Sequence, residues 1–465
     1  MKNIDRRDFL KKTSLSAAAI ATVSGLAARS IVGPEREAGT LYMGGFAAPK
    51  LETIRTAFIG VGARGPSHLR FLSKLEGVEI VAISDLYEDK VKAQLDFCKK
   101  VGKGKRHQNI AAYYGGEDKW KQMLQEVRPD VVFICTNWVN HAPMAIEAME
   151  QGAHAFVEVP MAVTLEEMWD IVITSERTQK HCMMMENVNY DRDELMFLNM
   201  CRQGVLGELL HAEASYIHEL RGQMNQVERG TGSWRTLHYA HRNGNLYPTH
   251  GLGPVAQYMN LGRGDDNFGS LVSFSTPALG RQKYAQKNYP ADHKWNQLDY
   301  KGGDLNTSII KTTLGRTIMV QWDETSPRPY SRLNLVQGTK GTLAGFPTRV
   351  ALEGGVKGAT DSHHEWVQGE KLQLLYETYD HPLYKRLSQT TKDSGHGGMD
   401  GMMAYRIVEC LRNGEPLDQN VYEGCFWSAV SPLSERSVEQ GGAPQAFPDF
   451  TRGGWKETDP LQIIS

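Results

Sequence analysis

The chain is poor in cysteine, and this shortage excludes a disulfide-stapled class of protein. Its 465 residues include six cysteines, and no two of them form a C-x-x-C pair. Such sparse spacing cannot supply a disulfide scaffold. We expect packed thiols, since two of the six lie in apolar strand-like runs where a thiolate is disfavoured. The six are Cys98, Cys135, Cys182, Cys201, Cys410 and Cys425.

Charge of one sign and long apolar runs are also scarce. The formal net charge is −2, and no basic run is long enough to indicate nucleic acid or an anionic membrane surface as a partner. No apolar stretch reaches the roughly 20 residues of a membrane span. A small polar substrate is therefore the expected partner, and the length favours two domains over one.

One stretch, residues 56–85, has the pattern of a dinucleotide-binding unit. After an apolar strand-like run, Gly60, Gly62 and Gly65 have the spacing G-x-G-x-x-G. In this fingerprint the first glycine allows a tight turn, the second lets backbone approach a pyrophosphate, and the third lets the next helix pack closely. Asp85 ends a second apolar run about twenty residues later, where a carboxylate binds the ribose hydroxyls of NAD and repels the additional phosphate of NADP. The stretch predicts an NAD site, with a purely structural glycine turn as the alternative.

Strand-like and helix-like segments alternate up to Asn187, which predicts a parallel sheet with crossover helices. The later strands are expected at 130–136, 153–158 and 181–186, and helices at 142–151 and 165–179. Ligands of such sheets bind beyond the carboxyl ends of the strands. The side chains that follow these ends are therefore candidates for the cofactor site: Asn137, Trp138, His141, Glu158, Val159 and Asn187.

Beyond Asn187 the strand-like runs are separated by turn residues, which predicts a largely antiparallel sheet. We therefore expect an α/β chain: a Rossmann-type doubly wound parallel sheet, then an α+β domain whose sheet also serves a homo-oligomer interface. A helical pattern at 399–411 predicts a segment that packs back on the cofactor domain. The expected divisions are 1–30 (export signal), 31–52 (linker), 53–188 (NAD-binding domain), 189–395 (substrate domain) and 396–465 (C-terminal helical segment).

The N-terminus resembles a twin-arginine export signal. Residues 5–12 read DRRDFLKK and lead into a weakly apolar, alanine-rich run. Because that machinery carries folded proteins, the cofactor can be inserted before export. We therefore expect a periplasmic or exported protein whose NAD is tightly bound and recycled. An ordinary amphipathic first helix is the alternative.

Residues 233–250, SWRTLHYAHRNGNLYPTH, form the densest polar and aromatic cluster. Its end favours proton transfer, because a histidine such as His250 titrates near neutral pH and Tyr247 can hydrogen-bond a neighbouring substrate oxygen. Two alternatives remain open. The pair His238 and His241 has a spacing that can hold zinc, and a histidine beside proline and glycine can be a satisfied turn residue.

Weaker candidates lie outside this cluster. Taken alone, Tyr216 and Tyr330 are typical of aromatic residues in sheets and loops. His396 and Asp400 stand at the start of the 399–411 helical pattern, where an acid in the first turn indicates helix capping.

Together these runs resemble the NAD-dependent α-N-acetylgalactosaminidases of glycoside hydrolase family 109, which are relatives of the Gfo/Idh/MocA oxidoreductases. The motifs are the twin-arginine start, GVGARGP, TNWVNH, EVPMA, ENVNY, WR, HRNGNLYPTHGLGP, RPYSR and GHGGMD. The resemblance covers nearly the whole chain from Arg55, and YPTHGLGP and GHGGMD are its most specific parts. It implies hydrolysis of terminal α-N-acetylgalactosamine or a related α-glycoside.

The resemblance also implies a set of site residues. It adds NAD contacts from Ala63, Arg64, Asp85, Trp138, Val139, Asn140, His141, Glu158, Val159, Asn187 and Tyr247. It implies substrate contacts from Tyr216, Arg235, Tyr247, Pro248, Thr249, His250 and Tyr330. Among these we expect His250 to be the principal acid and base, with Tyr247 at the C3 oxygen and Tyr330 or Tyr216 at the leaving group, and we expect no metal.

The implied mechanism is redox-assisted elimination, and NAD-dependent glycosidases are known exceptions to the two-carboxylate rule. NAD⁺ takes a hydride from C3 of the sugar, a base removes the acidified C2 proton, the C1 group leaves, water adds, and the hydride returns. One departure separates this chain from the wider oxidoreductase group, because Val159 stands where those enzymes have a lysine between Glu and Pro. The rival functions are a periplasmic NAD(P)-dependent sugar oxidoreductase and a protein that keeps NAD only as a structural element.

Overall fold

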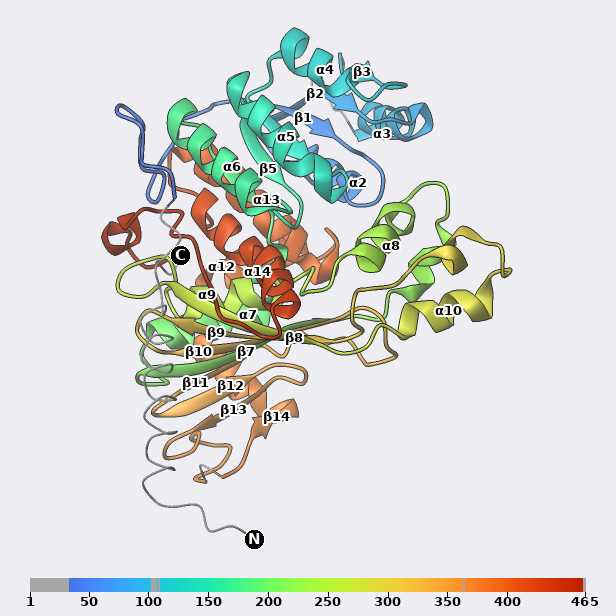
Figure 1. Ribbon diagram of the computed structural model, residues 1–465. Helices are drawn as coiled ribbons and strands as arrows, with labels where there is room; N and C mark the ends of the chain where they lie inside the picture. The colour runs from blue at the N-terminus through green and yellow to red at the C-terminus, as the bar shows by residue number, and fades with distance from the viewer. Residues whose placement is uncertain (1–32, 102–106, 108, 363, 463–465) are drawn as a thin grey trace.

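The structure is a computed structural model that describes residues 33–101, 107, 109–362 and 364–462. The predicted export signal lies outside these residues. A parallel sheet and a larger mixed sheet form separate layers, and C-terminal helices lie between them (Figure 1). No helix within the described ranges is long and apolar enough to cross a membrane.

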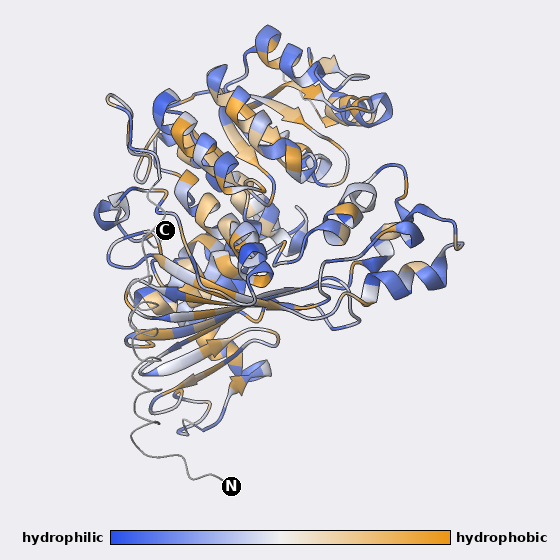
Figure 2. Cartoon of the chain, in the orientation of Figure 1, coloured by the Kyte–Doolittle hydropathy of each residue, from blue (hydrophilic) through white to orange (hydrophobic). Residues whose placement is uncertain are grey.

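The first sheet has six parallel strands in the order β3-β2-β1-β4-β5-β6. This is the doubly wound order with its switch point between β1 and β4. Figure 2 shows hydrophobic strands under helices whose outer faces are hydrophilic. The strands are β1 (Ile54–Ile59), β2 (Val78–Ser84), β3 (Ala111–Tyr113), β4 (Val131–Ile134), β5 (His154–Val157) and β6 (Cys182–Met184).

The helices of this domain cover both faces of the sheet. The α6 helix begins with a capping box, in which Thr164 and Glu167 bond each other's backbone N–H. The α5 helix begins at Trp138, four residues before the predicted start. The prediction began too late because Pro143, which lies inside the helix, is a typical signal of a helix boundary. The helices are α2 (Gly65–Leu72), α3 (Glu88–Val101), α4 (Lys119–Val127), α5 (Trp138–Glu150) and α6 (Leu165–Thr178).

The second sheet has nine strands in the order β14-β13-β12-β11-β7-β10-β9-β8-β15. Its pairs are antiparallel except β7 with β10, so the prediction of an α/β chain with a largely antiparallel second sheet is confirmed. The strands are β7 (Leu209–Ile217), β8 (Phe268–Ser275), β9 (Asn306–Thr312), β10 (Thr317–Asp323), β11 (Leu335–Gly338), β12 (Gly341–Ala344), β13 (Arg349–Leu352), β14 (Val367–Gln368) and β15 (Gln445–Ala446).

Helices of the second part cover one face of this sheet and extend beyond its end as an arm that carries α8 and α10 (Figure 1). Arg229 in the arm forms an ion pair of 2.8 Å with Asp89 in α3, so the arm reaches the first domain. The helices are α7 (Arg192–Arg202), α8 (Thr231–His241), α9 (Thr249–Tyr258), α10 (Gly280–Asn288), α11 (Gln373–Tyr379) and α12 (Pro382–Thr391). Short 3₁₀ turns are η1 (Asn187–Tyr190), η2 (Arg221–Asn225), η3 (Lys294–Gln297), η4 (Gly369–Leu372), η5 (His396–Gly398) and η6 (Gly454–Glu457).

The two ends of the described chain pack against both domains. Helix α13 (Met399–Asn413) packs on α2, whereas α14 (Val421–Glu439) lies between α6 and β8. The segment expected as a linker is held along residues 33–52, where Tyr42 stacks on Tyr422 at 5.1 Å and Met43 is buried.

Candidate functional site

The glycine turn between β1 and α2 has the shape that a bound pyrophosphate requires. Gly60 has φ +87°, which side chains rarely adopt, and a Cβ on Gly65 would lie 2.1 Å from the Gly60 carbonyl oxygen. A Cβ on Gly62 would meet no atom within 4 Å. The turn therefore leaves open space at the glycine where the fingerprint brings backbone to the phosphates, and Ala63 beside it is exposed.

Asp85 is fixed beside this turn by backbone donors. Its Oδ2 accepts from the Val61 amide at 2.8 Å and its Oδ1 from the Tyr87 amide at 3.0 Å. Each carboxylate oxygen can accept further hydrogen bonds. The structure thus places Asp85 at the end of β2 next to the glycine turn, as a contact with the adenosine ribose of NAD requires.

Arg64 is the centre of a charged network that joins the starts of α2 and α13 to the end of β5. Its guanidinium donates to Glu158 at 3.2 Å and to both oxygens of Asp400 at 3.1 and 3.2 Å. Asp400 also accepts from the side chain of Asn187 at 2.7 Å and contacts His396 Nδ1 at 2.9 Å. The capping interpretation of His396 and Asp400 is therefore wrong, because the Asp400 carboxylate, 2% exposed, points into this network instead of capping α13.

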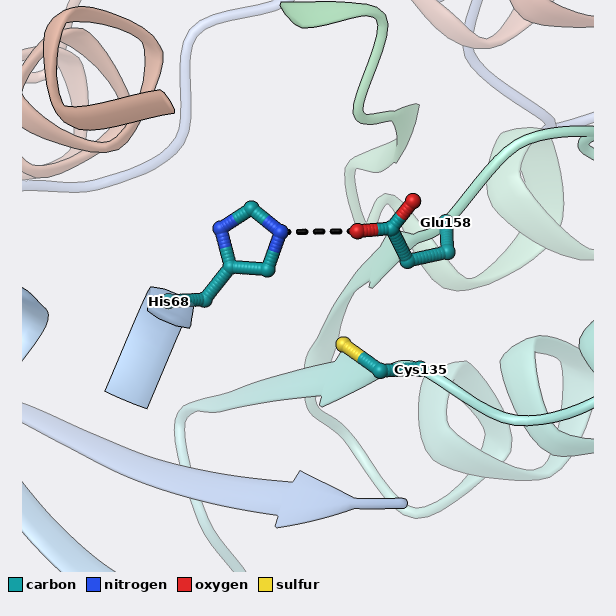
Figure 3. A group of neighbouring side chains, drawn as sticks. All are labelled: His68, Cys135 and Glu158. Atoms are coloured by element: carbon teal, nitrogen blue, oxygen red, sulfur yellow. Dashed lines mark hydrogen bonds and ion pairs between the residues drawn. The ribbon is translucent and has the colours of Figure 1, made fainter. Parts of the chain in front are cut away.

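Three neighbouring side chains under the network have metal-ligating atoms within 4.8 Å of one another: His68, Cys135 and Glu158 (Figure 3). The Glu158 carboxylate is already occupied, since His68 Nε2 lies 2.7 Å from its Oε1. Burial tends to raise the pKa of Glu158, but Arg64 and the His68 hydrogen bond outweigh it and lower the pKa to about 2. Burial raises the pKa of the Cys135 thiol, which disfavours the thiolate that binds metals. We therefore interpret the group as a support that holds Glu158 and Arg64 in place and not as a metal site.

Replacing Asp400 with Asn should lower the free energy of unfolding by about 2 kcal/mol at pH 7, because the buried Arg64 guanidinium loses a charged partner while the shape is kept. Burial alone would raise the pKa of Asp400, but His396 and Arg64 outweigh it and lower the pKa. The Asp400 contribution is therefore fully present above its unfolded pKa of about 3.9 and is lost as pH falls through the lower folded value.

Urea midpoints at pH 7 and pH 3 measure this effect. The urea midpoint of Asp400→Asn should lie below that of wild type at pH 7, and this difference should be smaller at pH 3. Asp96→Asn, at an exposed ion pair, should have the wild-type midpoint at both pH values. An equal gap at both pH values for Asp400→Asn would contradict the assigned charge.

Trp138, at the start of α5, joins the first domain to the aromatic cluster of the second domain. Its ring is 1% exposed and lies 5.9 Å from the ring of Tyr247 and 4.9 Å from that of His238. The Arg235 guanidinium stacks 5.0 Å from both Trp138 and Tyr247. Val139 is exposed and Asn140 half-buried in the first turn of α5, while Val159 is buried after β5.

His141 has both ring nitrogens against backbone carbonyls, with Nδ1 2.7 Å from Pro160 O and Nε2 3.2 Å from Thr136 O. Burial lowers its pKa, and the neutral ring donates a hydrogen bond to only one of these two carbonyls. His238 is also neutral, since burial lowers its pKa to about 4. The zinc alternative receives no support here: His238 packs on Trp138, His241 is exposed, and the one ligand group found among the described residues excludes both.

The predicted proton-transfer residues meet at one point. The ring of Tyr216, on β7, lies 4.7 Å from that of Tyr247 and 5.2 Å from that of His250. The Tyr247 and His250 rings are 4.9 Å apart. Burial raises the pKa of Tyr216, Tyr247 and Tyr330, which keeps these phenols protonated. Tyr247 and His250 were candidates from their own motif, whereas Tyr216 was expected here only from the family resemblance, and the fold brings its ring beside theirs.

Glu186 is the functional side chain that the sequence reasoning missed. It follows β6, is 0% exposed, and its Oε1 lies 2.6 Å from His250 Nδ1. A carboxylate at Nδ1 fixes the tautomer and leaves Nε2 free toward a substrate. The motif ENVNY contained this residue, but only the fold brings it to α9.

Two further partners were also missed. His218 Nδ1 lies 2.8 Å from the Tyr216 hydroxyl, and Arg332 donates to the Tyr330 hydroxyl at 3.0 Å. Because arginine has no acceptor, the Tyr330 oxygen must be the acceptor, and its proton is free to bond a ligand.

Several buried polar atoms around this cluster have no partner among the residues that the structure describes. They are Asn137 Oδ1, Trp138 Nε1, Arg235 Nε, Thr249 Oγ1, Glu186 Oε2 and Glu324 Oε1. Other such atoms lie elsewhere in the described residues, but these six belong to side chains in or beside the aromatic cluster, where a polar ligand would satisfy them. Thr249 begins α9 and Pro248 is its N-cap, so the run from Tyr247 to His250 is presented by one helix start.

Comparisons with known proteins match both domains. Residues 190–457 match a family described as "Glycosyl hydrolase 109, C-terminal domain", and residues 54–186 match "Oxidoreductase family, NAD-binding Rossmann fold". Glycosyl hydrolase family 109 protein 1 of Akkermansia muciniphila is 64% identical over 93% of this chain and 89% of its own length. The family 109 protein of Shewanella baltica strain OS185 is 54% identical over the full length of both chains.

Solved structures show the same fold at low identity. An NAD-binding oxidoreductase from Klebsiella pneumoniae superposes with a TM-score of 0.66 at 15% identity, covering 85% of this chain and 99% of its own. Levoglucosan dehydrogenase in complex with NADH and L-sorbose superposes with a TM-score of 0.62 at 15% identity, covering 86% of this chain and 100% of its own.

Proposed function

Since the chain belongs to glycosyl hydrolase family 109 and carries an NAD-binding Rossmann domain, we propose that it hydrolyses terminal α-N-acetylgalactosamine, or a related α-glycoside, without net change in the cofactor. One observation carries the proposal: the Glu186–His250 pair lies beside Tyr247, whose ring packs toward Trp138 at the carboxyl edge of the NAD-binding sheet. An acid–base pair and a redox cofactor site therefore adjoin one substrate position.

The residues around the proposed substrate position have separate roles in cofactor binding and in proton transfer. The glycine turn, Asp85, Glu158 and Asn187 would hold NAD, which when bound supplies reversible oxidation at C3 of the sugar. Tyr247 bonds the C3 oxygen and relays the hydroxyl proton through Tyr216 to His218 as the hydride leaves, and the proton returns by the same route when the ketone is reduced. His250 removes the C2 proton through Nε2 while Glu186 stabilises the charge at Nδ1.

In the proposal, Tyr330 and Tyr216 bind the leaving group and the attacking water. Tyr330, whose oxygen is held by Arg332, has its proton free to bond the departing oxygen, and Tyr216 is hydrogen-bonded to the half-buried His218, which connects it to solvent. The same groups, with protons reversed, deliver water to C1. Because Val159 stands where the wider oxidoreductase group has a lysine, the C3 hydroxyl proton must leave through another group, and Tyr247 takes this role in the proposal.

Proton NMR of a chromogenic α-N-acetylgalactosaminide with the enzyme in deuterated water tests the mechanism. We expect deuterium at C2 of the released sugar and no accumulation of NADH. Sugar that keeps its C2 proton would exclude elimination. Conversion of a free sugar with a net change in cofactor redox state would favour the rival sugar oxidoreductase.

We also propose that the protein is exported, keeps its NAD bound and forms a homo-oligomer. The twin-arginine pattern supports export to the periplasm by the twin-arginine machinery, and re-reduction of the sugar within each turnover requires NAD to stay bound. The second sheet presents apolar side chains to the outside, with Phe274 62% and Ile309 38% exposed, which supports its use as a homo-oligomer interface.

A further inference from the structure

A cavity of about 210 Å³ lies beside the catalytic cluster and takes no part in the reaction proposed above. It is formed where the start of α7, the segment between β10 and β11 and the segment between β12 and β13 meet. Its walls include Asp191, Glu194, Arg332, Asn334, Phe346 and Thr348. A volume of this size can hold part of a ligand rather than a single water.

A row of aromatic rings joins this cavity to the catalytic histidine. The Tyr216 ring lies 5.2 Å from His250 and 6.2 Å from Tyr330, whose ring lies 5.7 Å from Phe346. Tyr330 and Phe346 are 40% and 37% exposed, so part of each ring is open to a ligand. The row therefore offers an apolar surface that starts at the leaving-group side of the site and ends at the cavity.

Arg332 contacts Tyr330 and also lines the cavity. It donates to the Tyr330 hydroxyl, and its guanidinium carbon lies 4.8 Å from the Phe346 ring. It is held by Glu194 and Asp191 at 2.6 and 2.8 Å. A group bound in the cavity is thus in contact with the residue that orients Tyr330.

One side chain offers the cavity an unused hydrogen-bond donor. Asn334 is 2% exposed, and its Oδ1 accepts from the Tyr258 hydroxyl at 2.9 Å. Its Nδ2 has no partner among the described residues, yet it is not one of the fully enclosed unsatisfied atoms. Asn334 is one of the residues that line the cavity, and its amide is the polar group that it brings to that wall.

The backbone around the cavity is also unusual. Phe346 has φ +55°, and Leu333 and Asn334 have φ +57° and +51°. A bulky residue such as phenylalanine or leucine in the left-handed region is an outlier, and such outliers cluster at ligand sites.

We propose that this cavity is an aglycone subsite that binds a neutral, hydroxyl-bearing sugar attached to the N-acetylgalactosamine. The inference rests on the proposed function, since it assigns the leaving group. Phe346 and Tyr330 supply the flat apolar surface that packs on the C–H face of a sugar ring, and Asn334 donates to a hydroxyl. Arg332 is paired with Asp191 and Glu194, and Asp193 adds a further acidic side chain to the wall, so an anionic aglycone is disfavoured.

Kinetics on two substrates test the subsite: methyl α-N-acetylgalactosaminide and a disaccharide of α-N-acetylgalactosamine on galactose. Phe346→Ala should raise KM for the disaccharide about tenfold and leave KM for the methyl glycoside unchanged. Asn334→Asp, which keeps the side-chain shape and removes the donor, should act in the same direction. Leu314→Ala, at an exposed apolar residue between β9 and β10, is the control and should change neither substrate.

An equal effect of Phe346→Ala on both substrates, or none on either, would overturn the subsite. If the wild type cleaved neither substrate, the proposed function would fail, and a measurement without turnover would still decide the cavity. Saturation-transfer NMR of the disaccharide with the His250→Ala protein should show contact at the galactose protons. Adding Phe346→Ala should abolish that contact, and persistence of the signal would remove the cavity from sugar binding.

Discussion

The His250→Ala enzyme should lose about 10³-fold in kcat and keep its full complement of NAD. A positioned general acid–base group contributes typically about 10²–10⁴-fold, and no other imidazole contacts both Tyr216 and Tyr247 in the described structure. The proposed NAD contacts at the glycine turn and Asp85 are not in contact with His250, so cofactor content should be kept. Initial rates on a chromogenic substrate give kcat, and NAD released by denaturing the purified protein gives cofactor content per chain.

Two variants control this result. Glu186→Gln keeps a side chain that can accept from His250 Nδ1 and removes only the negative charge, so kcat should fall by about 10- to 100-fold. His211→Ala removes a histidine whose Nδ1 lies 2.8 Å from the Thr317 hydroxyl on the second sheet, and should leave kcat unchanged. If His250→Ala kept kcat within tenfold of wild type, another residue would be the base.

The first domain could be predicted closely because its strands are continuous apolar runs. The predicted second strand and β2 coincide over Val78–Ser84, which is buried on both faces of a parallel sheet. The three-residue β3 was not predicted, since so short a strand carries no period. In the second domain the strand-like runs became β7 to β12, while the parallel pairing of β7 with β10 depends on chain connections that no local pattern encodes.

The site shows the same division between local and long-range information. Residues within one motif, such as Tyr247 and His250, were selected because their chemistry and spacing are local. Glu186 lies 64 positions from His250, and Asp400 lies 213 positions from its partner Asn187. Read locally, Asp400 is an acid in the first turn of a helix, and only the packing of α13 on α2 and η1 makes it the anion that neutralises Arg64.

Gly62→Ala should abolish NAD binding without destabilising the protein. The added Cβ meets no protein atom within 4 Å, and Gly62 does not have a positive φ. In such a setting Gly→Ala stabilises a fold by about 0.4–1 kcal/mol. The same methyl group occupies the space through which backbone approaches the pyrophosphate, so we expect affinity for NAD to fall about 100-fold or more.

Thermal unfolding separates these two effects. Binding to the native state raises Tm, so added NAD should raise Tm of nucleotide-stripped wild type and leave that of Gly62→Ala unchanged. Gly45→Ala, also in open space but outside the turn, should respond like wild type, whereas Gly65→Ala should lose both stability and NAD because its Cβ collides with the Gly60 carbonyl. A Gly62→Ala protein that bound NAD with wild-type affinity would show that the phosphates do not approach this glycine, and the cofactor pose inferred from the turn would be wrong.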